Sequence, residues 1–331
     1  MNATPPCRRR ALLATTLALL CSQACSPARV ANGFDLANAT IPVAEILRGG
    51  PPRDGIPSID NPQFVAAHEV DYLRDDDIVI GIERDGVARA YPLRILIWHE
   101  IVNDVIGGRP VAVTYCPLCG SAMVFDAMAG GERRSFGVSG LLYNSDVLMY
   151  DRESESLWSQ LAMKAVSGPA VGSTLEWLPS EHMTWAAWKA RHPGGQVLST
   201  DTGHRRDYRR NGYGAYFASG ETMFPVPTTR RELPAKDWVL GVIVAGQPKA
   251  YPVAELPANQ VVNDTLGGRP LAVEWNPEAR RPTVRDGDGA RIPALLVYWF
   301  AWQAFHPATE LWSGGGDSQP RDGAPARAQS R

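Results

Sequence analysis

The feature that most constrains this chain is a long internal repeat. Residues 78–117 align without gaps to residues 238–277, at an offset of 160, and 17 positions are identical. Ordinary residue frequencies would give about two or three matches by chance. A second similarity, at an offset of 114, relates residues 185–193 to residues 299–307. The offsets differ by 46, so the second copy lacks about that many residues from its middle.

Each copy is predicted to contain a β-hairpin, a short helix and a further strand. Residues 78–82 and 87–91 are largely apolar and lie on either side of Asp85-Gly86, a dipeptide typical of hairpin turns. Residues 93–102 fit a short helix, and residues 111–115 fit the next strand. The sequence therefore predicts a mainly β (α+β) fold of two related β-rich modules, each with a short helix, the second copy being degenerate.

The chain begins with the pattern of an export signal. Arg8, Arg9 and Arg10 precede a ten-residue, mostly apolar stretch, which is too short to cross a bilayer because a spanning helix needs about 20 residues. Cys25 follows Ala24 and is a candidate for lipidation, although cleavage without lipidation fits as well. We expect an exported protein, either periplasmic or an envelope-anchored lipoprotein.

These features divide the chain into six parts. In order they are an export segment, a proline-rich and irregular lead-in, a first module, a linker, a shortened second module and a disordered tail. Their bounds are residues 1–25, 26–74, 75–200, 201–235, 236–313 and 314–331.

Charge restricts the partners. Lysine plus arginine number 33 and aspartate plus glutamate 35, so the chain carries no large positive field that would attract nucleic acid. The expected partner is a small molecule or a metal ion. Contact with a membrane is expected only through an N-terminal lipid anchor.

The repeat separates shared scaffold from residues that belong to one copy. Cys116 and Cys119 form a CPLCG motif between two predicted strands, and Asn276 and Ala279 replace them in the second copy. A strand–CxxC–strand arrangement resembles a metal knuckle rather than a thioredoxin motif, in which CxxC opens a helix. In an oxidising compartment the same pair can instead close as a local disulfide.

His99 and Glu100 are also confined to the first copy, where Asn259 and Gln260 replace them in the second. The sequence predicts a metal site made of Cys116, Cys119 and His99, with Glu100 orienting His99. Thiolates with imidazole suit copper or zinc, and without such a metal no cofactor is expected.

A second polar cluster lies in the region that the second copy lacks. It combines hydrogen-bonding side chains with a short buried strand at residues 147–150. These side chains are candidates to support the metal ligands or to bind a ligand beside them. The alternative is a tight hairpin with capping residues. The candidates are Tyr143, Asn144, Asp146, Asp151, Arg152, Trp158, Ser159 and Gln160.

Four motifs resemble the family known as domain of unknown function 3179. They are WHEIVND at residues 98–104, YCPLCG at 115–120, GVSGLLYNSD at 137–146, and DR at 151–152 followed by LWSQ at 157–160. Ala162-Met163 departs from the family, in which a Thr-Gly pair is more typical. The resemblance implies a secreted or envelope protein of bacteria or archaea and implies no established activity.

Three functions follow from these residues. The first is metal binding or thiol redox chemistry at Cys116 and Cys119. The second is a non-enzymatic module that binds a ligand or partner, in which the CxxC is a structural disulfide. The third is a hydrolase or transferase with Cys116 as nucleophile and His99 as base. The sequence alone does not decide whether the protein is an enzyme.

Overall fold

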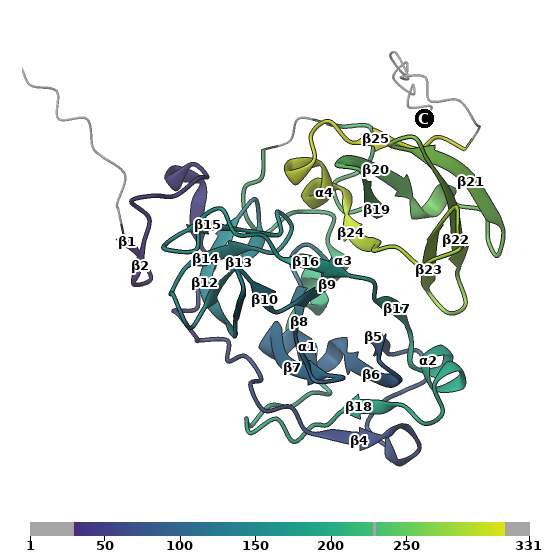
Figure 1. The fold of residues 1–331 in the computed structure, drawn as a ribbon, viewed down its shortest axis with the longest axis horizontal. Helices are drawn as coiled ribbons and strands as arrows, with labels where there is room; N and C mark the ends of the chain where they lie inside the picture. Colours follow the sequence, from purple (N-terminus) through teal and green to yellow (C-terminus); the bar gives the residue numbers. More distant parts are fainter. Residues whose placement is uncertain (1–29, 228–229, 315–331) are drawn as a thin grey trace, which may run out of the picture.

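The computed structural model describes residues 30–227 and 230–314. The export segment with Cys25, residues 26–29 and the tail from residue 315 lie outside the described residues. The fold is mainly β, with 43% of residues in strands and 12% in helices, as predicted. Five sheets of three to five strands make up its body (Figure 1). Within the described ranges no helix is both long and apolar enough to cross a membrane.

The first sheet is built around the predicted hairpin, whose turn places Asp85 and Gly86 at positive φ. Its strand order is β17-β5-β6-β18-β4, and helices α1 and α2 follow β6 and β17. The strands are β4 (Phe64–Ala66), β5 (Ile78–Arg84), β6 (Val87–Pro92), β17 (Glu181–Thr184) and β18 (Gln196–Leu198). The helices are α1 (Leu93–His99) and α2 (Trp185–Arg191).

The second sheet, in the order β16-β9-β8-β7, carries the CxxC motif in the turn between β8 and β9. Its strands are β7 (Ile101–Ile106), β8 (Arg109–Cys116), β9 (Ser121–Asp126) and β16 (Glu176–Leu178). The expected helix at residues 93–102 ends at His99, because residues 101–106 pair with β8 as a strand instead. From Val102 to Ile106, buried residues alternate with more exposed ones, as on a strand with one face in the core.

The third sheet, in the order β15-β14-β13-β12-β3, contains the predicted second polar cluster. Its strands are β3 (Ile46–Arg48), β12 (Phe136–Tyr143), β13 (Asp146–Asp151), β14 (Leu157–Ser159) and β15 (Lys164–Ser167). No sheet of the second half corresponds to it within the described residues. The ribbon β10 (Met128–Ala129) and β11 (Glu132–Arg133) precedes it.

The second half of the chain repeats the first two sheets, except that β4 and β16 have no counterpart among the described residues. β19 pairs with β20 in the register of β5 with β6, so that Val239 faces Pro252 as Val79 faces Pro92. β25 runs parallel to β20 as β18 does to β6. The elements are β19 (Trp238–Val244), β20 (Gln247–Pro252), β21 (Val261–Leu266), β22 (Arg269–Asn276), β23 (Arg281–Asp286), β24 (Leu295–Tyr298), β25 (Glu310–Leu311), α4 (Trp299–Phe305) and the 3-10 helix η3 (Val253–Glu255).

The lead-in at residues 26–74 is more regular than expected. Where described, it contains four short strands, of which β3 joins β12 and β4 joins β18. The edges of these two sheets each have unpaired backbone groups, and the lead-in satisfies them by pairing. Its other elements are β1 (Val30–Ala31), β2 (Phe34–Asp35), η1 (Val43–Glu45) and η2 (Ala67–Glu69).

Candidate functional site

The two cysteines occupy a tight turn in which Gly120 has a φ of +67°. Cys116 ends β8 and pairs in the ladder with Ser121, so the motif stays between two strands. The ring of Trp238, from the second half, packs against Gly120 and leaves no room for a side chain there. Both cysteines are free thiols, and Cys116 and Cys119 are only 2% and 0% exposed.

Asp146 joins the cysteines from the third sheet. It begins β13 after a turn in which Asn144 and Ser145 both have positive φ. One carboxylate oxygen of Asp146 and the two Sγ atoms all lie within 4.8 Å of one another. Asp146 Oδ2 accepts a hydrogen bond from the Leu161 amide at 3.0 Å, whereas the buried Oδ1 has no partner.

The cluster is electrostatically uncompensated. Burial raises the pKa of Asp146 to about 7 and raises the pKa of both thiols. Burial, with the Asp146 charge, also raises the pKa of Glu100 to about 8. Among the described residues no arginine or lysine forms an ion pair with these groups. Buried acids without a cation favour their protonated forms.

A chain of buried hydrogen bonds supports the turn from behind. Ser121 Oγ donates to Gln160 Oε1 at 2.8 Å, and Gln160 Nε2 donates to Thr114 Oγ1 at 2.8 Å. All three side chains are fully buried. Gln160, one of the predicted cluster residues, therefore links the third sheet to the strands that carry the cysteines.

The linker and the second half cover the turn. Tyr216, on α3 (Gly214–Ala218), donates its hydroxyl to the Leu118 carbonyl at 2.6 Å. The Tyr298 amide donates to the Cys119 carbonyl at 2.9 Å. Lys236 lies over the Tyr216 ring, 3.6 Å from its centroid. The thiols therefore lie beneath a layer of tyrosines.

A family model described as "Protein of unknown function (DUF3179)" matches residues 53–309. The chain belongs to this family. The match confirms the resemblance inferred from the motifs and extends it over both halves, including the cysteine turn and Asp146. No curated protein and no solved structure matches the chain.

In this DUF3179 chain, His99 does not join the cysteines. Its ring Nδ1 lies 2.7 Å from the Pro57 carbonyl oxygen, which only accepts, so Nδ1 carries the proton. Nε2 then accepts from the Tyr208 hydroxyl at 2.7 Å. Burial lowers the pKa of His99 to about 4. Both nitrogens are engaged, so the geometry does not support the expected ligand or catalytic base.

Glu100 also differs from its expected role. No hydrogen bond between its carboxyl group and His99 occurs among the described residues. Glu100 caps the C-terminal end of α1 with a φ of +57° and faces the cysteine cluster, where its charge acts on the pKa of Cys116 and Tyr213. A buried carboxyl group at the negative end of a helix, with strained backbone, is unfavourable in three ways.

The remaining predicted residues contribute to the framework of the third sheet. Asp151 accepts from Trp158 Nε1 at 2.7 Å and from Arg134, and Ser159 Oγ accepts from the Ala162 amide. Arg152 donates to Ser58 and pairs with Asp60. Asn144 shapes the turn before Asp146, and Tyr143 packs edge-on against Phe305. None of these side chains belongs to the group formed by the two thiols and Asp146.

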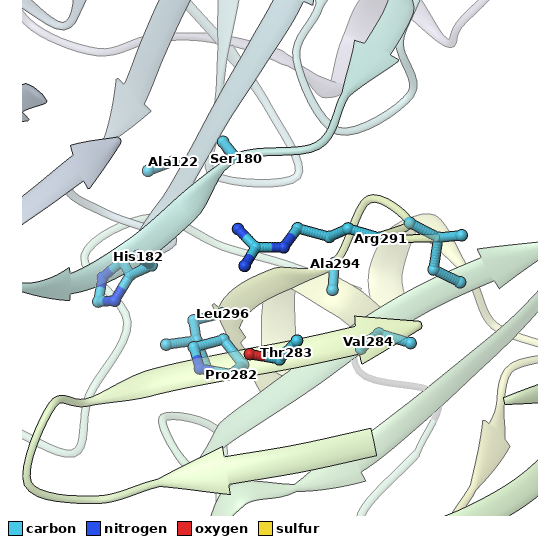
Figure 2. Close-up of a pocket in the computed structure, with 10 residues that line it drawn as sticks. Ala122, Ser180, His182, Pro282, Thr283, Val284, Arg291, Ala294 and Leu296 are labelled. Atoms are coloured by element: carbon cyan, nitrogen blue, oxygen red, sulfur yellow. The ribbon is translucent and has the colours of Figure 1, made fainter. Parts of the chain in front are cut away.

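A small cavity lies where the two halves meet, away from the cysteines. Figure 2 shows Ser180 and His182 on one side of it and Thr283, Arg291 and Leu296 on the other. Its volume of about 10 Å³ is room for a single water molecule. Arg291 also pairs with Glu181, which fastens the second half to β17.

Proposed function

We propose that this protein binds a divalent metal ion of the zinc class through Cys116, Cys119 and Asp146. The observation that carries the proposal is the convergence of three buried donor atoms, one from a carboxylate whose Oδ1 has no other partner. Without an ion, burial favours the protonated forms of these acids. A divalent cation would replace their protons and supply the missing positive charge.

The donor set favours zinc over copper. Two thiolates and one carboxylate are ordinary zinc ligands, with bonds of about 2.3 Å to sulfur and 2.0–2.2 Å to oxygen. The hard carboxylate suits cuprous copper poorly, and imidazole is missing from the cluster. Three protein donors leave one position of a tetrahedral ion for water or an outside ligand, as in zinc enzymes.

Two competing functions fit the geometry less well. A nucleophilic Cys116 would need a lowered thiol pKa, but burial raises it, and His99 is engaged elsewhere. Thiol exchange with a partner protein would need an exposed sulfur, whereas both are covered. A local disulfide remains chemically accessible because the sulfurs are adjacent.

The testing experiment is metal analysis of the full chain purified under reducing conditions. We expect about one zinc ion per chain, displaced by a chelator together with the exposure of two reactive thiols. Cys119→Ser and Asp146→Asn should each lower the zinc affinity at least tenfold. Asn276→Ser, at the second-half position equivalent to Cys116, is the matched control and should bind as the unmodified chain does.

A chain without zinc would point to a disulfide at the cysteine turn. If the reduced chain neither contains nor takes up zinc, while Cys116 and Cys119 carry no free thiol in protein prepared without reductant, the pair is a structural disulfide. The protein would then be a non-metal binding module. We further propose that the two halves arose by duplication and that the second lost the site, in agreement with their shared registers and with Asn276 and Ala279 at the cysteine positions.

A further inference from the structure

Equivalent strand edges are paired in the first half and unpaired in the second. In the first half, β7 and β18 each lie at or near a sheet edge, and the lead-in pairs with both of them. Their counterparts β21 and β25 end their own sheets, with no further strand on the outer side among residues 30–227 and 230–314. Figure 1 shows β4 beside β18. Two unpaired edges therefore flank one groove in the second half.

The first half shows how such a groove is filled. Ile59 forms a parallel bridge with Val102, and its carbonyl accepts from the Asn103 amide at 2.8 Å. Five residues later, Phe64 packs edge-on against Tyr91, with ring centroids 5.8 Å apart. Ile59 is 1% exposed. One segment, residues 57–66, therefore joins both edges, with a bend at Asp60 and Asn61 between the two contacts.

In the second half the same groove is open. It has a volume of about 870 Å³, and its lining includes Val262 and Asn263, which correspond to Val102 and Asn103. Trp312, which follows β25 and lines the groove, packs against Tyr251 with ring centroids 6.1 Å apart, so it takes the place that Phe64 has against Tyr91. Along the groove, β21 keeps an edge without a further strand among residues 30–227 and 230–314, as a strand-binding site requires.

Charge distinguishes the open groove from the filled one. Glu255 and Glu310 stand where the first half has Ile95 and Gln196. Lys249 is already paired with Asp264 and Glu310. Glu255 and Asp264 line the groove together with Lys249, and Glu255 has no ion pair among the described residues. A ligand for this groove should carry a basic side chain.

We propose that the groove between β21 and β25 binds an extended peptide segment of a partner protein by strand addition. The segment carries an apolar side chain at the position of Ile59, with a lysine or arginine next to it. A second copy of this chain is a poor occupant, because its own residues 57–66 are already used. The tail at residues 315–331 contains no large apolar residue to fill the place of Ile59. The proposal is independent of the metal site.

The test uses the full chain and a labelled peptide of residues 57–66 that carries Asp60→Lys. We expect saturable binding of one peptide per chain, with amide NMR shifts confined to β21, β25 and their neighbours. Ile59→Ala in the peptide should weaken binding roughly tenfold, because it removes the buried apolar anchor. The unsubstituted peptide should bind more weakly than the lysine form, and Glu255→Lys in the protein should remove that preference.

Glu221→Lys, an exposed acid in the linker, is the matched control and should leave binding unchanged. Absence of saturable binding, or equal binding of the Ile59→Ala peptide, would overturn the proposal. So would strong protection of residues 315–331 from hydrogen exchange in the chain without peptide, because the tail itself would then occupy the groove. Val262→Lys offers a second variant on β21 and should weaken binding as well.

Discussion

The thiol of Cys119 lies 3.4 Å from the carbonyl oxygen of Ser145. The turn between β8 and β9 therefore packs against the turn that precedes β13 in the third sheet. The residue after Ser145 is Asp146, the third donor. The second half has a similar turn, in which Asn276 Oδ1 accepts from the Ala279 amide at 2.7 Å. It has no counterpart of the third sheet within the described residues.

This difference predicts the outcome of a graft. The double substitution Asn276→Cys and Ala279→Cys should recreate the CxxC turn but not the carboxylate. We expect zinc binding there to be at least about a hundredfold weaker than at the first site, because two thiolates alone leave the ion under-coordinated. A chelator competition with Cys119→Ser in the first site measures it. Equal affinity at the two sites would show that Asp146 is not a ligand.

The buried carboxyl groups predict how stability varies with pH. Asp146 and Glu100 have pKa values raised to about 7 and about 8, so the folded chain holds protons that the unfolded chain has lost. Their stabilisation is therefore lost as pH rises through 7 and 8. The pKa of His99 is lowered to about 4, so protonation of this ring favours the unfolded chain. This effect on stability is present only below the ordinary histidine pKa of about 6.5.

The metal-free chain should accordingly lose free energy of unfolding between about pH 6.5 and 8. Urea unfolding in the presence of a chelator measures this. Asp146→Asn should flatten the part of the curve near pH 7, and saturating zinc should offset the decline, since the ion binds the deprotonated donors. A metal-free stability that rises steadily over this window would contradict the burial of these groups.

His99→Asn should separate structure from metal binding. The substitution leaves the Tyr208 hydroxyl and the Pro57 carbonyl without their present partner, at a cost of about 1–3 kcal/mol in the free energy of unfolding. Zinc affinity should change less than about twofold, since the ring is not among the donors. Thermal unfolding and chelator competition on the same sample test both parts. Loss of zinc without loss of stability would return His99 to the ligand set.

Much of the fold could be predicted because repeats and hairpins are local patterns. The 160-residue offset identifies the shared strands, and Asp85-Gly86 identifies the turn between two of them. The strands of the lead-in escaped prediction because residues 46–48 and 64–66 are short and pair with strands about 95 and 130 residues away. Their structure depends on edges that only the folded protein supplies.

The site was harder to predict for a different reason. Comparing the two copies marks every residue that one copy lacks, whether it is a ligand or a structural side chain. His99 satisfies that test because its partner Tyr208 lies in the linker, which is also present once. Asp146 was in the predicted polar cluster, but nothing in its local sequence separates it from Asp151, which holds Trp158. The packing of the third sheet against the cysteine turn makes the distinction.

The first 25 residues predict export. Cell fractionation should find a mature form shorter by about 25 residues in the envelope. Cys25→Ala should release the protein from membranes if that residue carries a lipid, and radiolabelled palmitate should mark only the unmodified chain. A full-length protein confined to the cytosol would refute the export signal. If the mature protein is soluble in the envelope both with and without Cys25→Ala, cleavage without lipidation is favoured.

The last prediction concerns the scaffold that the halves share. The ring of Trp188 lies against Gly81, and Trp302 lies against Gly241, so closely that a Cβ on either glycine would overlap the ring. Each tryptophan is also stacked on a histidine one turn later, which leaves it little freedom to move. Gly81→Ala and Gly241→Ala should each lower the free energy of unfolding by about 1–3 kcal/mol.

Gly212→Ala is the control, because its Cβ would meet no atom within 4 Å, and it should stay within about ±0.5 kcal/mol. Urea unfolding of the three variants gives the comparison. Because Gly81 and Gly241 belong to equivalent hairpins, their effects should agree in sign and approximate size, while only Gly81→Ala, in the half with the cysteines, could also alter zinc affinity. A neutral Gly241→Ala beside a damaging Gly81→Ala would mean that the second hairpin does not pack on its tryptophan as the first one does.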